Sequence, residues 1–107
     1  MSLDVTLRNE KGDEVYTDNI THNLNTMAKE AGIYMHLWRP DEILIAHAHQ
    51  LIEPLTVACA LLATEKSRFT PHNPANGWGA WDNLLLFCAN YLQACKDNPD
   101  ALVSVSR

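Results

Sequence analysis

Basic side chains are scarce in this sequence. Its 107 residues hold eight Lys and Arg against thirteen Asp and Glu, a formal net charge of −5, and the basic residues stand singly along the chain. A protein that binds DNA or RNA electrostatically needs several cations on one face to displace counterions from the phosphates. We therefore expect no DNA or RNA partner. A small phosphorylated ligand stays compatible with this composition, because one or two Arg with backbone amides suffice to hold it.

Cysteines are few and odd in number. Cys59, Cys88 and Cys95 all fall within apolar, helix-like stretches, whereas a small secreted domain would favour paired cysteines. We interpret them as buried thiols in a reducing compartment. The sequence begins without the basic segment and apolar run of a signal peptide, and its apolar stretches are too short for a membrane span. These features predict a cytoplasmic protein with no membrane partner.

Motifs for catalysis and cofactor binding are missing. The sequence contains no G-x-G-x-x-G, G-K-[ST] or G-x-S-x-G pattern and no C-x-x-C pair, so loops that cradle phosphates or present a nucleophile are not indicated. His47 and His49 stand two residues apart, which on a helix points the rings about 200° from one another and prevents them from sharing an ion. We predict a protein that is not an enzyme and that uses neither a cofactor nor a metal ion.

The pattern of apolar residues predicts one α+β domain over residues 1–107. Apolar and polar residues alternate over 3–8, and a polar turn with Gly12 leads into a second β-prone run at 14–17, which together predict an N-terminal β-hairpin. A short strand with Leu102, Val103 and Val105 is expected to complete a small antiparallel sheet, because a lone hairpin is marginally stable in water.

Three helices are expected between these strands. The first covers 22–31, with Thr21 as its N-cap and Gly32 as its C-cap. The third begins at Trp81 and ends before Pro99. Residues 33–38 are expected to form a tight turn on the core, and 64–79 a loop.

The second helix is expected to begin after Pro40 and to run for about five turns. Its apolar stripe is Leu44, Ala48, Leu51, Leu55, Ala58 and Leu62. Pro54 is expected to kink or divide it near Glu53. Apolar residues also follow a second side of this helix, at Ile45, Ile52, Cys59 and Leu61, a breadth that suits either a central helix or contact with a second subunit. We therefore expect a homo-oligomer.

Two clusters of loop residues are candidates for a binding site. In the run from Asn73 to Trp81, Trp78 stands between two glycines. It can plug the core, or it can stack on a base while Asn76 and backbone N–H groups hold polar parts of the ligand. In the second cluster, Arg39 beside Trp38 can stack, pair with a phosphate or pair with a carboxylate.

The same second cluster has a plain packing interpretation as well. Tyr34, His36 and Trp38 can simply pack as aromatic residues in a turn between helices. At the start of the first helix, capping accounts for Thr21 but leaves His22 and Asn23 free for hydrogen bonds.

These stretches resemble a family of small proteins encoded by phages and prophages. The resemblance is carried by Ile20-Thr21-His22-Asn23-Leu24, by Gly32-Ile33-Tyr34 with Leu37-Trp38-Arg39-Pro40, and by Asn73-Pro74 with Asn76-Gly77-Trp78-Gly79. It spans nearly the whole chain, but departs at Ala80 and Trp81, where relatives carry a polar residue and Tyr. Most members of that family have no assigned activity, so the resemblance implies a setting in the cytosol of a host bacterium and not a reaction.

The setting suggests a function, because short acidic phage proteins without catalytic motifs often act on host defence. Our hypothesis is a non-enzymatic counter-defence protein, a homo-oligomeric sponge that sequesters a nucleotide-derived signalling molecule. The alternative is a protein–protein interaction module that inhibits a host defence enzyme through its acidic surface. The predicted ligand-binding residues are Trp78, Arg39, Tyr34, Asn76, His22, Asn23, Trp38 and Arg107.

Overall fold

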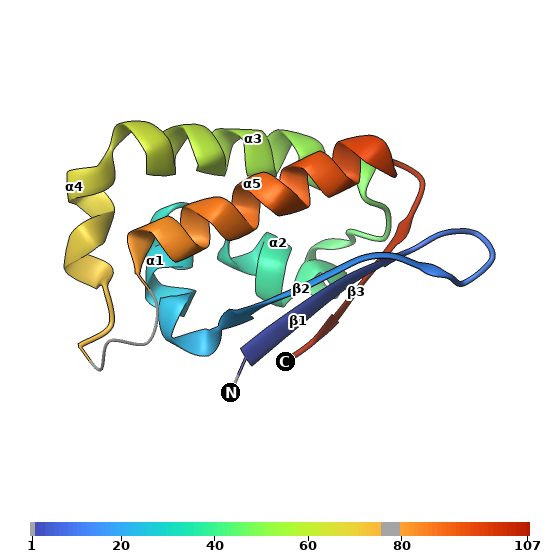
Figure 1. Cartoon of the computed structure of the whole chain (residues 1–107), viewed down its shortest axis with the longest axis horizontal. Coiled ribbons are helices and arrows are strands. Elements are labelled where there is room, and N and C mark those ends of the chain that lie inside the picture. The colour runs from blue at the N-terminus through green and yellow to red at the C-terminus, as the bar shows by residue number, and fades with distance from the viewer. Residues whose placement is uncertain (1, 76–79) are drawn as a thin grey trace.

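The computed structural model describes residues 2–75 and 80–107 (Figure 1). Its strands are β1 (Ser2–Arg8), β2 (Glu14–Thr21) and β3 (Leu102–Ser106), and its helices are α1 (Asn25–Glu30), α2 (Tyr34–Trp38), α3 (His49–Thr64), α4 (Lys66–Phe69) and α5 (Trp81–Asp97). Short 3-10 turns lie at His22–Leu24, Pro40–Ile43 and Thr70–His72. No helix in these two ranges is both long and apolar enough to cross a membrane.

The sheet confirms the predicted hairpin and the predicted third strand. β1 lies in the middle, antiparallel to β2 on one side and to β3 on the other. Val5 of β1 is opposite Asp18 of β2 and Val105 of β3, so the last strand pairs within the chain. The apolar residues of β1 are fully buried, as its alternation predicts.

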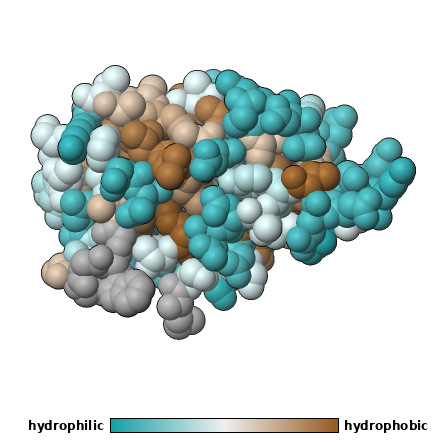
Figure 2. Space-filling model, viewed as in Figure 1, coloured by the Kyte–Doolittle hydropathy of each residue, from teal (hydrophilic) through white to brown (hydrophobic). Residues whose placement is uncertain are grey.

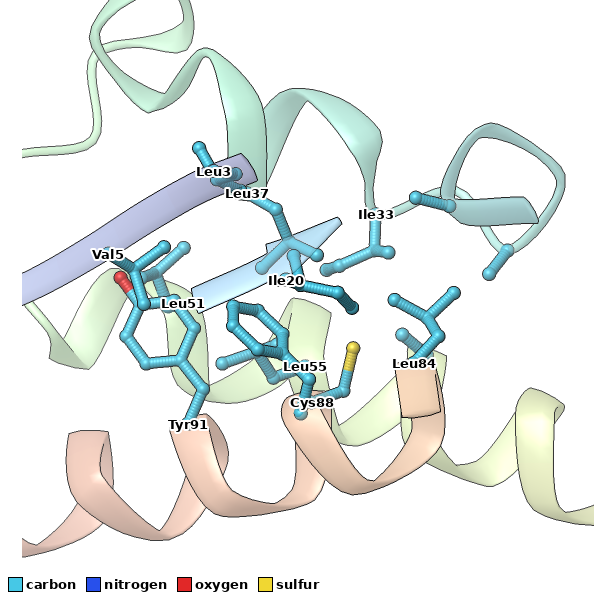
Figure 3. Packing of buried hydrophobic residues seen from close by; sticks show 14 of the residues in the cluster. Leu3, Val5, Ile20, Ile33, Leu37, Leu51, Leu55, Leu84, Cys88 and Tyr91 are labelled. Carbon is cyan, nitrogen blue, oxygen red and sulfur yellow. The ribbon is translucent and has the colours of Figure 1, made fainter. Parts of the chain in front are cut away.

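The helices cover one face of this sheet and enclose the core (Figure 1). α3 and α5 lie side by side, and α5 also packs directly on β2. Figure 3 shows side chains from all of these elements meeting in one cluster: Leu3, Val5 and Ile20 from the sheet, Ile33 and Leu37 around α2, Leu51 and Leu55 from α3, and Leu84, Cys88 and Tyr91 from α5. The α+β fold is therefore the one predicted.

The start of the long helix differs from the prediction. The turn Pro40–Ile43 ends at Leu44, which has φ of 61° in the left-handed region and is 86% exposed, so its expected place in the buried stripe is wrong. The next residues run alongside β3: the Val103 N–H donates to the Ala46 carbonyl at 2.9 Å, and His47 bridges to Leu102. These hydrogen bonds with a distant strand displace the helix start to His49.

The left-handed conformation of Leu44 gives a first testable prediction. Leu44→Gly is expected to raise the free energy of unfolding by about 0.5–1 kcal/mol, because a left-handed backbone strains any residue with a Cβ and the exposed side chain contributes little packing. Ile43→Gly is the matched control: its φ is not positive, so glycine there should destabilise by about 1 kcal/mol. Urea denaturation measures both. Destabilisation of similar size in both variants would contradict the prediction.

Three other local predictions are corrected. α3 runs through Pro54 to Thr64 without the expected division, because one missing backbone donor near the start of a well-packed helix is tolerated. Residues expected to be a turn and a loop form α2 and α4, and Phe69 at the end of α4 is fully buried. His47 precedes the helix, so its ring stacks on that of His49 with centres 5.7 Å apart.

The second apolar side of α3 packs inside the chain. Ile52, Cys59 and Leu61 are half-buried against the core, so the residues that suggested a second subunit already have a partner. Some apolar surface remains over α3 and α5 between hydrophilic patches (Figure 2), and Val57 and Leu86 are 53% and 61% exposed. The homo-oligomer stays a prediction.

Candidate functional site

Five of the eight predicted ligand residues meet in one place. His22 follows β2, Tyr34 and Trp38 lie on α2, Arg39 follows α2, and Arg107 follows β3. Direct contacts link these residues, which we call the aromatic–arginine cluster. Residue types in separate segments had suggested each member, but only the fold brings them together.

A stacked aromatic pair forms the centre of the cluster. Tyr34 and Trp38 are four residues apart on α2, a spacing that places both on one helix face. Their ring centres are 5.4 Å apart and their planes differ by 12°. Trp38 is only 2% exposed, whereas Tyr34 is half-buried. Trp38 therefore supports the Tyr34 ring from within the core, and Tyr34 is the ring that can meet a ligand.

His22 is held by the buried tryptophan. The Trp38 indole Nε1–H donates to His22 Nδ1 at 3.1 Å. Because Nδ1 accepts, a neutral His22 carries its proton on Nε2. That Nε2 is buried and has no hydrogen-bond partner among the described residues. A buried donor without an acceptor costs about 1–3 kcal/mol, so a ligand oxygen near Nε2 would remove an existing penalty.

The two arginines reach the cluster from distant parts of the chain. Arg39 Nε donates to the Tyr34 hydroxyl at 3.4 Å, and its Nη1 pairs with Glu42 at 2.7 Å. The hydrogen bond with Glu42 raises the pKa of Arg39 above its already high ordinary value. Arg107 Nη1 donates to the Trp38 carbonyl at 2.7 Å and lies 4.0 Å from Asp41. Glu42 and Asp41 are thus counter-ions of Arg39 and Arg107.

Sequence reasoning missed a third cation. Lys29 Nζ lies 4.7 Å from the centre of the Tyr34 ring, a cation–π contact. The signal that could have found it is Gly32, whose φ of 76° turns the chain between α1 and α2 and brings Lys29 back to Tyr34. Three cations therefore surround one aromatic pair in a chain of net charge −5.

Comparisons with known proteins add no relative. No protein-family model, curated protein or solved structure matches this chain.

The three remaining predicted ligand residues are not part of the aromatic–arginine cluster. Asn23 is exposed beside His22, and its backbone N–H donates to Thr21 Oγ1 at 3.3 Å, which confirms Thr21 as a cap. Asn76 and Trp78 lie outside the residues that the structure describes. Trp81 has a structural role: its indole N–H donates to the Leu62 carbonyl at 2.7 Å and joins α5 to α3.

The described side chains show no activated thiol and no metal centre. Burial raises the pKa of Cys59, and it raises the pKa of Cys95 to about 12, which leaves the thiol in its unreactive protonated form. Burial of the Cys88 thiol also raises its pKa. Within residues 2–75 and 80–107, no three His, Cys, Asp or Glu side chains are grouped to hold a metal ion.

Proposed function

We propose that this protein is a non-catalytic binding protein that sequesters a nucleotide-derived signalling molecule, as a phage counter-defence protein in the host cytosol. The observation that supports the ligand class is that Arg39 donates to the Tyr34 hydroxyl and Arg107 to the Trp38 backbone carbonyl, so both cations lie beside the residues of one stacked aromatic pair in an otherwise acidic chain. A planar ring with cations at its edge complements a base that carries phosphate. The phage setting comes from the sequence motifs alone.

In the proposed complex, the base stacks on Tyr34 in the position that Lys29 Nζ occupies in the free protein. The Lys29 side chain is exposed, long and flexible, so its ammonium group can move off the Tyr34 ring and bind a phosphate. Arg39 and Arg107 bind phosphate oxygens, and His22 Nε2, which is buried in the free protein, donates to a ligand acceptor once the side chains that cover it move aside. Trp38 does not touch the ligand but fixes the plane of the Tyr34 ring.

A phosphate can displace the carboxylates that now pair with the arginines. Both Arg39 and Glu42 are about two-fifths exposed or more, and ion pairs of that kind contribute only about 0–1 kcal/mol. A charge-assisted hydrogen bond to a bound ligand contributes about 1.5–3 kcal/mol, and stacking of one base about 1–3 kcal/mol. Two such hydrogen bonds and one stack supply about 4–9 kcal/mol, and after part of this offsets the entropic cost of association, binding in the millimolar to micromolar range is expected.

The modest affinity expected of a single cluster is a reason to propose the sponge as a homo-oligomer. A sponge must compete with a host receptor, and one cluster on one subunit reaches only modest affinity. A ligand with two bases or two phosphates that contacts the clusters of two subunits gains the second contact as an intramolecular event. Oligomerisation would then tighten binding without any additional contact within a subunit.

The test is binding of linear and cyclic nucleotides to variants of the cluster, measured by isothermal titration calorimetry and native mass spectrometry. Arg39→Ala and Arg107→Ala are each expected to lower the affinity by about 10- to 100-fold. Arg8→Ala is the matched control, because Arg8 has similar exposure and a similar ion pair, with Glu14 at 3.1 Å, on the outer face of the sheet. Unchanged affinity in both cluster variants, or no bound nucleotide from the panel or from extract of bacteria with active signalling defences, would refute the proposal.

The alternative function, inhibition of a host defence enzyme by direct contact, is favoured by a different observation. Leu44, Val57 and Leu86 leave apolar side chains more than half exposed on a chain of net charge −5. Copurification distinguishes the two functions: a nucleotide released on denaturation supports the sponge, and a stoichiometric host enzyme supports the inhibitor.

A further inference from the structure

The outer edge of β2 is open. In the sheet order β2-β1-β3, β2 pairs with β1 on one side and, within the described residues, with no strand on the other. An edge strand presents backbone N–H and C=O groups that have no ladder partner. β2 is eight residues long and contains no proline, so this edge can accept a further strand over its whole length.

A groove runs along β2, and α5 forms its opposite wall. One hollow of about 400 Å³ is lined by residues 18–21 of β2 and by Asn83, Leu86, Phe87 and Asn90 of α5. A second hollow, of about 360 Å³, is lined by residues 16–18 and by Asn90, Gln93, Ala94 and Asp97. The two share Asp18 and Asn90, so they form one continuous groove. Figure 1 shows α5 passing over β2 along this line.

The groove is acidic and, among its lining residues, has no cation. Asp18 lines both hollows and Asp97 lines the second, and neither hollow is lined by Lys or Arg. The 61% exposed Leu86 adds apolar surface at the first hollow, where Ile20 and Phe87 are almost fully buried. An occupant that complements the groove carries a cation near the aspartates and an apolar side chain near Leu86.

The geometry of strands fixes the spacing of those two side chains. A strand advances about 3.3 Å per residue and alternates its side chains, so side chains that enter the same groove are two or four residues apart. Ile20 and Tyr16 mark the two hollows and are themselves four residues apart on β2.

A second copy of this chain is a poor occupant. Asp18 is opposite the buried Val5, so its carboxylate lies on the helix-covered side of an edge strand. Inward-pointing charges on edge strands oppose self-association. Antiparallel pairing of two β2 strands about their centres would bring Asp18 of one copy near Asp18 of the other, and like charges across a strand pair are destabilising.

We propose that the groove between β2 and α5 binds an extended, basic segment of another protein, which adds to the sheet as a fourth strand. Backbone hydrogen bonds to β2 supply affinity, and Leu86 together with Asp18 and Asp97 selects the sequence. This surface is separate from the aromatic–arginine cluster and shares none of its residues, so the inference does not depend on nucleotide binding.

The experiment is selection of a displayed library of random ten-residue peptides on the full chain. The enriched peptides are expected to carry Lys or Arg two or four residues from an apolar residue. When synthesised and added to the protein, these peptides are expected to slow hydrogen exchange at the β2 amides. Asp97→Lys is expected to weaken those peptides about tenfold, since Asp97 is exposed and lines the groove. Asp4→Lys makes the same charge change on the outer face of β1 and should leave binding unchanged.

Three results would overturn the proposal: no enriched peptide, enriched peptides without a cation, or protection of amides away from β2. Equal loss of binding in Asp97→Lys and Asp4→Lys would do the same, because it would show a response to net charge alone. Nucleotide affinity measured in parallel separates this outcome from the proposed function, since neither aspartate belongs to the aromatic–arginine cluster.

Discussion

Trp38→Ala is expected to lower the free energy of unfolding by about 3–5 kcal/mol, the usual cost of removing a large buried aromatic side chain. Trp38 is the largest fully buried residue and is 2% exposed. Its ring stacks on Tyr34, and its indole N–H donates to His22. The substitution therefore leaves a cavity and also removes the only described partner of His22 Nδ1, which would add a second unpartnered nitrogen to a residue that already has one.

Trp38→Phe separates packing from hydrogen bonding. Phenylalanine keeps a stacking ring but cannot donate to His22, so its expected cost is smaller, about 1–3 kcal/mol. Urea denaturation curves fitted with a common m-value compare the free energies of unfolding of the two variants. A loss below about 1 kcal/mol for Trp38→Ala would show that the Trp38 side chain is not packed as described.

Leu55→Ala is expected to lower the free energy of unfolding by about 2–5 kcal/mol. Leu55 is fully buried at the centre of α3, where Figure 3 shows it between the sheet and the α5 residues Cys88 and Tyr91. The core is close-packed, so neighbouring side chains can fill only part of the space that the missing Cγ, Cδ1 and Cδ2 atoms would leave.

The matched control is Val57→Ala on the same helix. Val57 is 53% exposed, so its truncation should change the free energy of unfolding by no more than about 0.5 kcal/mol. Folding and unfolding rates of both variants, measured against urea concentration, also show whether the α3–α5 contact forms before or after the folding transition state. Equal destabilisation by the two substitutions would contradict the packing of α3 on α5.

Local patterns predicted the elements that depend on local signals. The alternation of residues 3–8 and the glycine turn are sufficient for the hairpin, and Gly32 ends the first helical segment as its place in the sequence indicates. The start of α3 could not be predicted in this way. Its apolar stripe continues back to Leu44, but residues 46–48 hydrogen-bond to the segment at 101–103, more than fifty residues away.

The candidate site was predictable in its residue types but not in its geometry. Tyr34, Arg39 and His22 attract attention because polar and aromatic side chains stand together near helix ends. That Trp38 lies inside the core, and that Arg107 reaches its carbonyl, are consequences of β3 pairing with β1. A residue that contributes through a contact 69 positions away gives no local signal.

The central position of β1 has a consequence for the order of folding. β2 follows β1 after a short turn, but the other neighbour of β1 is β3, so Val5 must meet the distant Val105. The hairpin and helices can form before this contact, whereas the sheet closes only with a pairing of very long sequence separation. Until then β1 is itself an edge strand whose apolar side chains lack one neighbour. Arg107 joins the aromatic–arginine cluster in the same late step.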